Sequence, residues 1–447
     1  MKIAFAGFGE VNTPIEIIQN KCKGAEELLK KSGAEVYSCY PITDDYEEKD
    51  VNRAKEYFTG KDFDVMVLCV AGWIPTHAVI KVAEKFRHVP FVLWGLCGLI
   101  EDGRIVTTAD QAGTTALRKT MKDLGYTFKY VYEIIGEESR VNEVISFAKS
   151  VSAFNQLRSA KIGQMGFRDM NLYGTLFEGS SLKRTIGPEI ECFEMLEVVQ
   201  RAEKVSDIDI QKVVDQTVST WKFLKSADPE IIKKGVAYYL ALKQIIDERG
   251  YVAVSLKDVD GMKKLLGFPP AMIFMLLADR ENICTIPEND CLGNVTQVIV
   301  KALTNQIGAY LEFYEFFKDG VLAGVPDYVP KEIVDGEVTV SPEAFGLLSQ
   351  GVLNVSKVKE GELTMCRLSY EDGGYVMHMV KGKGVNPGKW EEAGWAQPAP
   401  QLPALKVLLD DTRDFADKVM GQHYIISYGD NTNVIKEFCG ICGIKVI

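Results

Sequence analysis

Short apolar runs alternate with amphipathic segments through residues 1–150. Uninterrupted apolar runs predict buried strands, and apolar residues at helical spacing predict helices between them. Strands of this kind separated by helices are typical of a parallel sheet covered on both faces. The expected strands are Lys2–Phe8, Glu35–Tyr40, Val65–Val70, Pro90–Leu96 and Phe128–Val131, and the expected helices are Pro14–Ser32, Val51–Phe58, His77–Phe86 and Thr114–Leu124.

A second α/β segment begins near Ile162 and has the same alternation. Its expected helices are Ile208–Leu224, Pro229–Glu248 and Ala271–Leu277, with a strand at Tyr251–Ser255. A further apolar helix follows Cys291 and closes the segment. The pattern therefore predicts a second sheet of the same class.

From about Ala309 the pattern changes to short alternating runs, and Gly and Pro become frequent. Alternation with period two predicts an antiparallel sheet or a small barrel. The expected strands are Tyr310–Phe317, Glu337–Val340, Glu362–Ser369, Tyr375–Lys381 and Tyr424–Tyr428, with helices at Ala404–Val419 and Thr432–Cys442. The predicted fold is α/β, with two doubly wound α/β domains (1–160 and 161–308) and a β-rich, barrel-like C-terminal domain (309–447).

Composition narrows the classes of function. The chain has 447 residues and a net charge of −11, which argues against a nucleic-acid partner and against an anionic membrane surface. It contains no run of eighteen apolar residues and no signal-peptide pattern at the N-terminus, so we expect a cytoplasmic protein. Its scattered cysteines are expected to be reduced thiols.

Two short motifs are set aside. Gly7-Phe8-Gly9 lacks the third glycine of a dinucleotide-binding turn, and Glu10 places a carboxylate where a pyrophosphate would lie. Cys439-Gly440-Ile441-Cys442 has no second cysteine pair to complete a zinc site. A redox role for Cys439 and Cys442 stays open, but two apolar helix residues are the preferred interpretation.

The segment Ile286-Pro287-Glu288-Asn289-Asp290-Cys291 carries the clearest chemical signal. Asp290 fits the start of the following apolar helix, where acidic side chains cap the backbone. Glu288 lies before that cap in an otherwise apolar approach, and helix capping does not explain it. We therefore regard Glu288 as a candidate functional carboxylate.

The next strand places one acid on each face. Tyr310, Glu312, Tyr314 and Phe316 share one face at period two, whereas Glu315 lies on the other. A carboxylate among aromatic residues is costly to bury unless a partner or a cation compensates. Periodicity does not decide between Glu312 and Glu315.

The sequence has four histidines, His77, His88, His378 and His423. Mn²⁺ and Mg²⁺ prefer carboxylates, with one imidazole tolerated. Glu288 and Glu312 supply such acids, and His423, just before a strand, is the candidate imidazole. Spacing in the sequence does not establish that these three residues converge.

These segments resemble the L-fucose and L-arabinose isomerases. The resemblance rests on Glu288-Asn289-Asp290 leading into a helix, the Leu311-Glu312-Phe313 step on the following strand, Gln422-His423 before a late strand, and Ser427-Tyr428-Gly429 after it. It implies three domains, Mn²⁺ or another divalent cation held by Glu288, Glu312 and His423, and a homo-oligomer. The oligomer implied is a trimer or hexamer whose active sites draw on neighbouring subunits.

The function that follows is aldose–ketose isomerisation of a small-molecule sugar through a cis-enediol, with Glu288 and Glu312 as the acid–base pair. One departure from the family is that no histidine lies between Glu312 and His378, where the chain reads Gly324-Val325-Pro326-Asp327. A non-catalytic sugar-binding protein on the same fold therefore stays open, as does an epimerase or lyase of a modified sugar. Candidate substrate-binding residues are Trp73, His77, Tyr173, Trp390 and Trp395.

Overall fold

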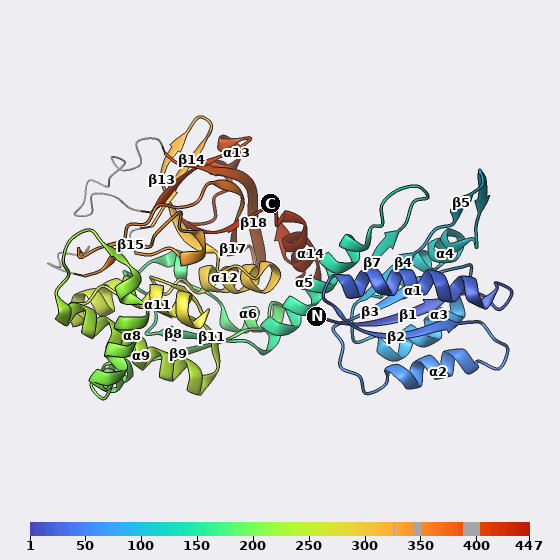
Figure 1. Cartoon of the computed structure of the whole chain (residues 1–447), viewed down its shortest axis with the longest axis horizontal. Coiled ribbons are helices and arrows are strands. Elements are labelled where there is room, and N and C mark those ends of the chain that lie inside the picture. The colour runs from blue at the N-terminus through green and yellow to red at the C-terminus, as the bar shows by residue number, and fades with distance from the viewer. Residues whose placement is uncertain (326, 344–350, 388–402) are drawn as a thin grey trace. The chain divides into compact units, whose positions relative to one another are not determined.

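The computed structural model describes residues 1–325, 327–343, 351–387 and 403–447 (Figure 1). The chain forms two compact units, Met1–Asn155 and Gln156–Ile447. Each unit has its own sheets and is described by itself. The predicted division into three domains, with boundaries after residues 160 and 308, stays a prediction.

The first unit is built on a parallel sheet in the order β2-β1-β3-β4-β7. Its strands are β1 (Lys2–Phe8), β2 (Glu35–Ile42), β3 (Val65–Val70), β4 (Phe91–Gly95) and β7 (Phe128–Tyr132). All six residues of β3 are buried, as expected for an apolar strand covered on both faces. Figure 1 shows helix α1 (Ile15–Lys31) on one side of the sheet and α2 (Lys49–Phe58) on the other.

The first unit also contains α3 (Thr76–Ala83), α4 (Asp110–Asp123) and a two-stranded hairpin, β5 (Leu99–Glu101) and β6 (Arg104–Val106). Helix α5 (Val141–Ser159) leads into the second unit. The predicted parallel α/β architecture is therefore confirmed for this part of the chain.

The second unit begins with another parallel sheet, in the order β12-β11-β8-β9. Its strands are β8 (Lys161–Met165), β9 (Glu189–Phe193), β11 (Tyr251–Leu256) and β12 (Cys284–Ile286). The accompanying helices are α6 (Gly179–Thr185), α7 (Met195–Ala202), α8 (Asp207–Gln216), α9 (Pro229–Arg249), α10 (Lys264–Leu266), α11 (Ala271–Glu281) and α12 (Cys291–Thr304). Most residues of α12 are buried, so the turn before this helix is held inside the unit.

The second unit continues with a seven-stranded sheet in the order β17-β20-β13-β14-β19-β18-β21. Because β17 also pairs with β18, six of these strands form a closed ring. The strands are β13 (Ala309–Phe317), β14 (Gly320–Gly324), β17 (Gly361–Glu371), β18 (Gly374–Val385), β19 (Ala404–Leu408), β20 (His423–Tyr428) and β21 (Lys445–Val446). Helices α13 (Thr412–Asp417) and α14 (Thr432–Cys442) and a small sheet of β10 (Lys222–Phe223), β15 (Thr339–Ser341) and β16 (Leu353–Asn354) complete the unit.

One hydrophobic core runs from the parallel sheet into the ring of strands. It includes Leu256 of β11, Leu363 of β17 and Tyr424 of β20, each with no more than 1% of its surface exposed. Shared burial of this kind ties the two sheets together. The carboxyl end of the parallel sheet and the ring can therefore contribute side chains to one site.

The predicted helix over Ala404–Val419 is wrong in its first part. Residues 404–408 form strand β19, and only Thr412–Asp417 is helical. Leu405, Val407 and Leu409 are buried in alternation, which is the period of a strand. Asp411 then caps the short helix by accepting a hydrogen bond from the backbone N–H of Asp414.

No single helix among the described residues is long and apolar enough to cross a membrane. Only the segments Asp258–Leu266 and Ala271–Glu281, taken together across a 118° bend, reach that length and apolarity.

Candidate functional site

The turn between β12 and α12 holds Glu288 in an unusual backbone conformation. Glu288 and Asn289 have φ angles of 63° and 51°, in the left-handed region that residues other than glycine adopt sparingly. The backbone N–H of Glu288 donates to Asp258 Oδ1 at 2.8 Å, and the Asn289 side chain donates to the Met165 carbonyl at 2.9 Å. These contacts hold the turn against its strain.

The ring of strands brings Glu312 and His423 together. β13 and β20 are antiparallel, and their register places Glu312 directly opposite His423. Tyr310, two residues before Glu312 on the same face, stacks on the His423 imidazole with a centroid distance of 4.1 Å and an interplanar angle of 12°. Glu315 is exposed, so the structure separates the two acids that periodicity left equivalent.

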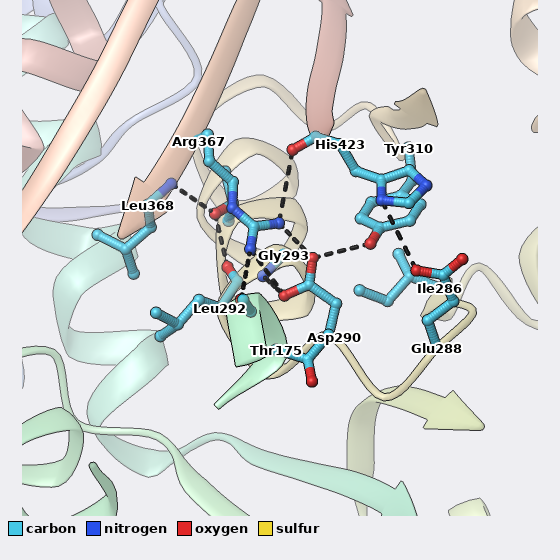
Figure 2. Close-up of polar contacts among 12 residues, drawn as sticks. Thr175, Ile286, Glu288, Asp290, Leu292, Gly293, Tyr310, Arg367, Leu368 and His423 are labelled. Carbon is cyan, nitrogen blue, oxygen red and sulfur yellow. Dashed lines mark hydrogen bonds and ion pairs between the residues drawn. The ribbon is translucent and has the colours of Figure 1, made fainter. Parts of the chain in front are cut away.

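Glu288, Glu312 and His423 lie within one small volume. His423 Nδ1 is 3.8 Å from Glu288 Oε2, the contact drawn in Figure 2, and His423 Nε2 is 3.6 Å from Glu312 Oε2. The imidazole thus lies between the two carboxyl groups, with a different nitrogen facing each. In these side-chain positions, no three His, Cys, Asp or Glu groups of the described residues are arranged to hold a metal ion.

Burial makes charge costly at all three side chains. It raises the pKa of Glu288 well above its usual value, and the nearby Asp258 and Asp327 charges add to this. Burial and the Asp327 charge raise the pKa of Glu312 to about 7. Burial lowers the pKa of His423 to about 3, which leaves the imidazole neutral.

Two further carboxylates surround this group, and neither was predicted. Asp258 and Asp327 are 1% and 4% exposed, and both contact the buried Lys263, whose Nζ is 3.1 Å from Asp258 and 3.4 Å from Asp327. Glu288 Oε2 is buried and has no hydrogen-bond partner among the described residues. Among the described residues, no ion pair joins Lys263 to Glu288 or Glu312, so its single charge balances only one of the two aspartates.

On the opposite side of the turn, every lone pair of the Asp290 carboxylate has a partner. Arg367 of β17 donates hydrogen bonds to both carboxylate oxygens of Asp290, and Nη2 lies 2.9 Å from Oδ1 (Figure 2). Asp290 also accepts from Tyr310 Oη at 2.8 Å and caps α12 by accepting from the backbone N–H of Gly293 at 3.0 Å. Burial alone would raise the pKa of Asp290, but the Arg367 charge and these hydrogen bonds bring it below its usual value.

The predicted substrate-binding residues have separate locations. Tyr173 lies in the second unit and is 81% exposed, and its neighbours Leu172, Gly174 and Thr175 line a cavity that also touches Glu288 and His423. Trp73 and His77 belong to the first unit, where both are exposed and Trp73 borders a separate cavity. Trp390 and Trp395 lie outside the described residues.

The sequence held weak signals for the residues that were missed. Asp258 closely follows the apolar strand β11, a position where α/β proteins gather functional side chains. Arg367 interrupts the buried run Leu363–Leu368 of β17, and a buried arginine requires a carboxylate partner. Neither pattern predicts which residue is the partner, because Glu288 is 30 residues from Asp258 and Asp290 is 77 residues from Arg367.

Comparison with known proteins gives a distant relationship. No family model matches the chain. It is 25% identical over 154 residues to L-arabinose isomerase of Lactiplantibacillus plantarum, a match that covers 32% of this chain and 32% of that relative. Because the match spans about a third of either protein, it supports at most a relationship to a sugar isomerase.

Two solved structures are also similar in part. The periplasmic binding protein of an arabinose ABC transporter from Shewanella sp. ANA-3 is 10% identical, with a TM-score of 0.18, over 68% of this chain and 87% of that one. An ABC transporter solute-binding protein from Actinobacillus succinogenes 130z, with bound D-allose, is 15% identical, with a TM-score of 0.17, over 68% and 92%. TM-scores this low establish neither a shared fold nor a shared function with this chain.

Proposed function

We propose that this protein is a divalent-cation-dependent aldose–ketose isomerase of a small-molecule sugar, with its active site at Glu288, Glu312 and His423. The observation that carries the proposal is a cluster of largely buried carboxyl groups around the neutral His423 imidazole. Only Asp258 and Asp327 of this cluster contact a positively charged side chain, Lys263. The distant match to L-arabinose isomerase supports the class of reaction.

The donor set suits Mn²⁺ or Mg²⁺. Two carboxylates and one imidazole are ligands that these cations accept, with positions left for substrate oxygens. His423 Nε2 is 3.6 Å from Glu312 and Nδ1 is 3.8 Å from Glu288, so the imidazole would ligate a cation through one of these nitrogens only. As they stand, these side chains form no metal-binding group, so the two acids and the imidazole would hold a cation only after side-chain rotation. A bound cation would also favour the ionised carboxylates that burial disfavours.

The cation, when bound, would act as a Lewis acid toward the carbonyl and adjacent hydroxyl oxygens of an open-chain sugar. One carboxylate of the Glu288/Glu312 pair takes the proton from C2 and leaves the cis-enediol. The same carboxyl group returns that proton to C1, while the other moves the hydroxyl proton.

The test combines metal content with turnover. Wild-type protein, Glu288→Gln, Glu312→Gln and the matched control Glu315→Gln are purified, and bound Mn²⁺ is measured. Each protein is then assayed for ketose formation on a panel of pentoses and hexoses, including L-arabinose and L-fucose, with and without Mn²⁺. Glu315 is on the same strand as Glu312 but exposed, so its variant controls for loss of a charge.

We expect Mn²⁺-dependent ketose formation by the wild type and by Glu315→Gln. Loss of a positioned acid or base costs about 10²–10⁴ in rate, so both other variants should fall by that factor. Turnover within about tenfold of wild type in either variant would refute the acid–base assignment. A protein that binds no Mn²⁺ and converts no sugar would refute the isomerase proposal in favour of a sugar-binding role.

A further inference from the structure

Lys263 is a buried lysine whose side chain is only 7% exposed. It ends a single π-helical turn, Asp258–Lys263, that follows strand β11. In a π-helix, hydrogen bonds join residues five apart, as Met262 N–H and the Lys257 carbonyl oxygen are joined here at 3.1 Å. Asp258 and Lys263 are also five residues apart, and the wide turn brings both to the same side, whereas in an α-helix they would point to different sides.

The Lys263 ammonium group joins two buried carboxylates from different parts of the second unit. Nζ lies 3.1 Å from Asp258 Oδ2, at the carboxyl end of the parallel sheet, and 3.4 Å from Asp327 Oδ1, which follows β14 of the ring. Among the described residues, neither aspartate has an ion pair with any other cation. Removal of this ammonium group would therefore leave two buried carboxylates without a cationic partner, which is a costly arrangement.

Asp258 connects Lys263 to the proposed active site. Its other oxygen, Oδ1, accepts a hydrogen bond from the backbone N–H of Glu288 at 2.8 Å, and Glu288 is the residue whose φ angle is 63°. The carboxylate thus contacts the ammonium group with one oxygen and the strained turn with the other. A strained backbone persists only where its surroundings fix it, so the orientation of the Asp258 side chain affects how firmly the turn is held.

We propose that Lys263 is a positioning residue: through its ion pair with Asp258 it fixes the turn that presents Glu288 to the proposed active site. The role of Glu288 as a cation ligand and acid–base group rests on the proposed function, whereas the holding of the turn does not. No ion pair among the described residues joins Lys263 to Glu288 itself, so the lysine acts through Asp258.

A lysine beside a cation site also has a direct electrostatic effect, and that effect has the opposite sign. Like charges repel, so removal of the Lys263 charge would by itself strengthen the binding of a cation. If Lys263 positions Glu288, its removal weakens cation binding instead. The direction of the change in Mn²⁺ affinity therefore separates a positioning role from a role of charge alone.

The experiment compares Lys263→Met with the matched control Lys264→Met. Lys264 is the next residue, its side chain is 63% exposed, and it pairs with Asp260 at 2.6 Å, so its variant loses the same charge from the same segment. A third protein, Lys263→Met/Asp327→Asn, has the net charge of the wild type and leaves only one buried aspartate without a cation. It takes the place of Lys263→Met if the single variant does not fold, as judged by circular dichroism and the unfolding midpoint.

Amide hydrogen exchange, followed by mass spectrometry in EDTA, reports on the turn without metal or sugar. The peptide that contains Glu288 and Asn289 should exchange about tenfold faster in Lys263→Met and in the double variant, because the hydrogen bond to Asp258 is weakened. Lys264→Met should stay within about threefold of the wild type, as should a peptide from β17 in every variant. Exchange of the Glu288 peptide within about threefold of the wild type in both Lys263 variants would overturn the proposal.

Calorimetric titration with Mn²⁺ gives the second result. Lys263→Met and the double variant should bind Mn²⁺ roughly 10- to 100-fold more weakly than the wild type, which is the usual effect of losing a residue that orients a metal ligand. Unchanged or tighter Mn²⁺ binding in Lys263→Met would overturn the positioning role. A wild type that binds no Mn²⁺ would refute the metal-dependent isomerase instead, and the exchange measurement would still decide whether Lys263 holds the turn.

Discussion

Asp290 and Glu288 lie two residues apart in one turn, and their surroundings differ in kind. Asp290 has a bidentate arginine, a tyrosine hydroxyl and a backbone N–H as partners, and its pKa is lowered. Glu288 Oε2 has no hydrogen-bond partner among the described residues, and its pKa is raised. The Glu288 side chain is 15% exposed and that of Asp290 3%, so the opposite directions of their pKa shifts come mainly from their partners.

The comparison separates a carboxylate with all its partners from one that lacks them. A fully satisfied carboxylate fixes the helix start and the strand against it, and it has no free lone pair to offer a ligand. A buried carboxylate without a partner destabilises the empty protein but is available to a cation or a proton. Strain in the Glu288–Asn289 turn fits the same division, because strained backbone gathers at functional sites.

The largest expected effect on stability comes from breaking the ion pair between Asp290 and Arg367. Asp290→Asn leaves the Arg367 charge buried without its partner, which should lower the free energy of unfolding by about 3–5 kcal/mol. Glu288→Gln removes a carboxyl group whose ionisation burial already disfavours, so it should destabilise the metal-free protein far less than Asp290→Asn does. Urea unfolding in EDTA at pH 7 measures both variants. Equal destabilisation by the two substitutions would abolish the distinction between the two acids.

A second expected effect is the pH dependence of the metal-free protein. The folded-state pKa of Glu312 is about 7, above its ordinary value of 4.5, so the folded state holds this proton more tightly than the unfolded chain does. The resulting stabilisation is fully present below about pH 4.5 and is lost as the pH rises to about 7. At about 1.4 kcal/mol per pH unit the loss amounts to roughly 3 kcal/mol.

Glu312→Gln should remove this decline, because glutamine does not titrate, while the exposed control Glu315→Gln should keep it. The test is to measure the free energy of unfolding of each protein at several pH values between 4.5 and 7.5, in the presence of EDTA. A wild type and a Glu312→Gln variant with parallel pH profiles would contradict the buried, protonated state of Glu312.

The smallest expected effect concerns Tyr310, which contacts both the paired Asp290 and the His423 imidazole. Tyr310→Phe removes the hydrogen bond from Oη to Asp290, at 2.8 Å, but keeps the ring stacked on His423. A lost hydrogen bond to a charged group costs about 1.5–3 kcal/mol, so stability should fall by about 2 kcal/mol while Mn²⁺ affinity changes little. Calorimetric Mn²⁺ titration beside urea unfolding separates the two quantities. A Mn²⁺ affinity lowered more than about tenfold would show that the hydroxyl group also orients His423.

Much of the fold was predictable because its signals are local. Apolar runs such as Val65–Val70 and alternating segments such as Tyr310–Phe317 carry their own periodicity. The segment Ala404–Leu408 shows the limit. Its residues Leu405 and Val407 suit a helix or a strand equally, and pairing with β14 and β18 decides for the strand.

The sequence by itself determined the secondary structure of most segments, the three candidate residues Glu288, Glu312 and His423, and the acidic balance of the chain. Only the tertiary structure decided that Glu312 and not Glu315 faces His423, since that depends on the register of β13 with β20. It also decided that Asp290 is paired while Glu288 is not, because Arg367 comes from a strand 77 residues away. Periodicity fixes which residues share a face, whereas the charge and burial of a site depend on contacts between distant segments.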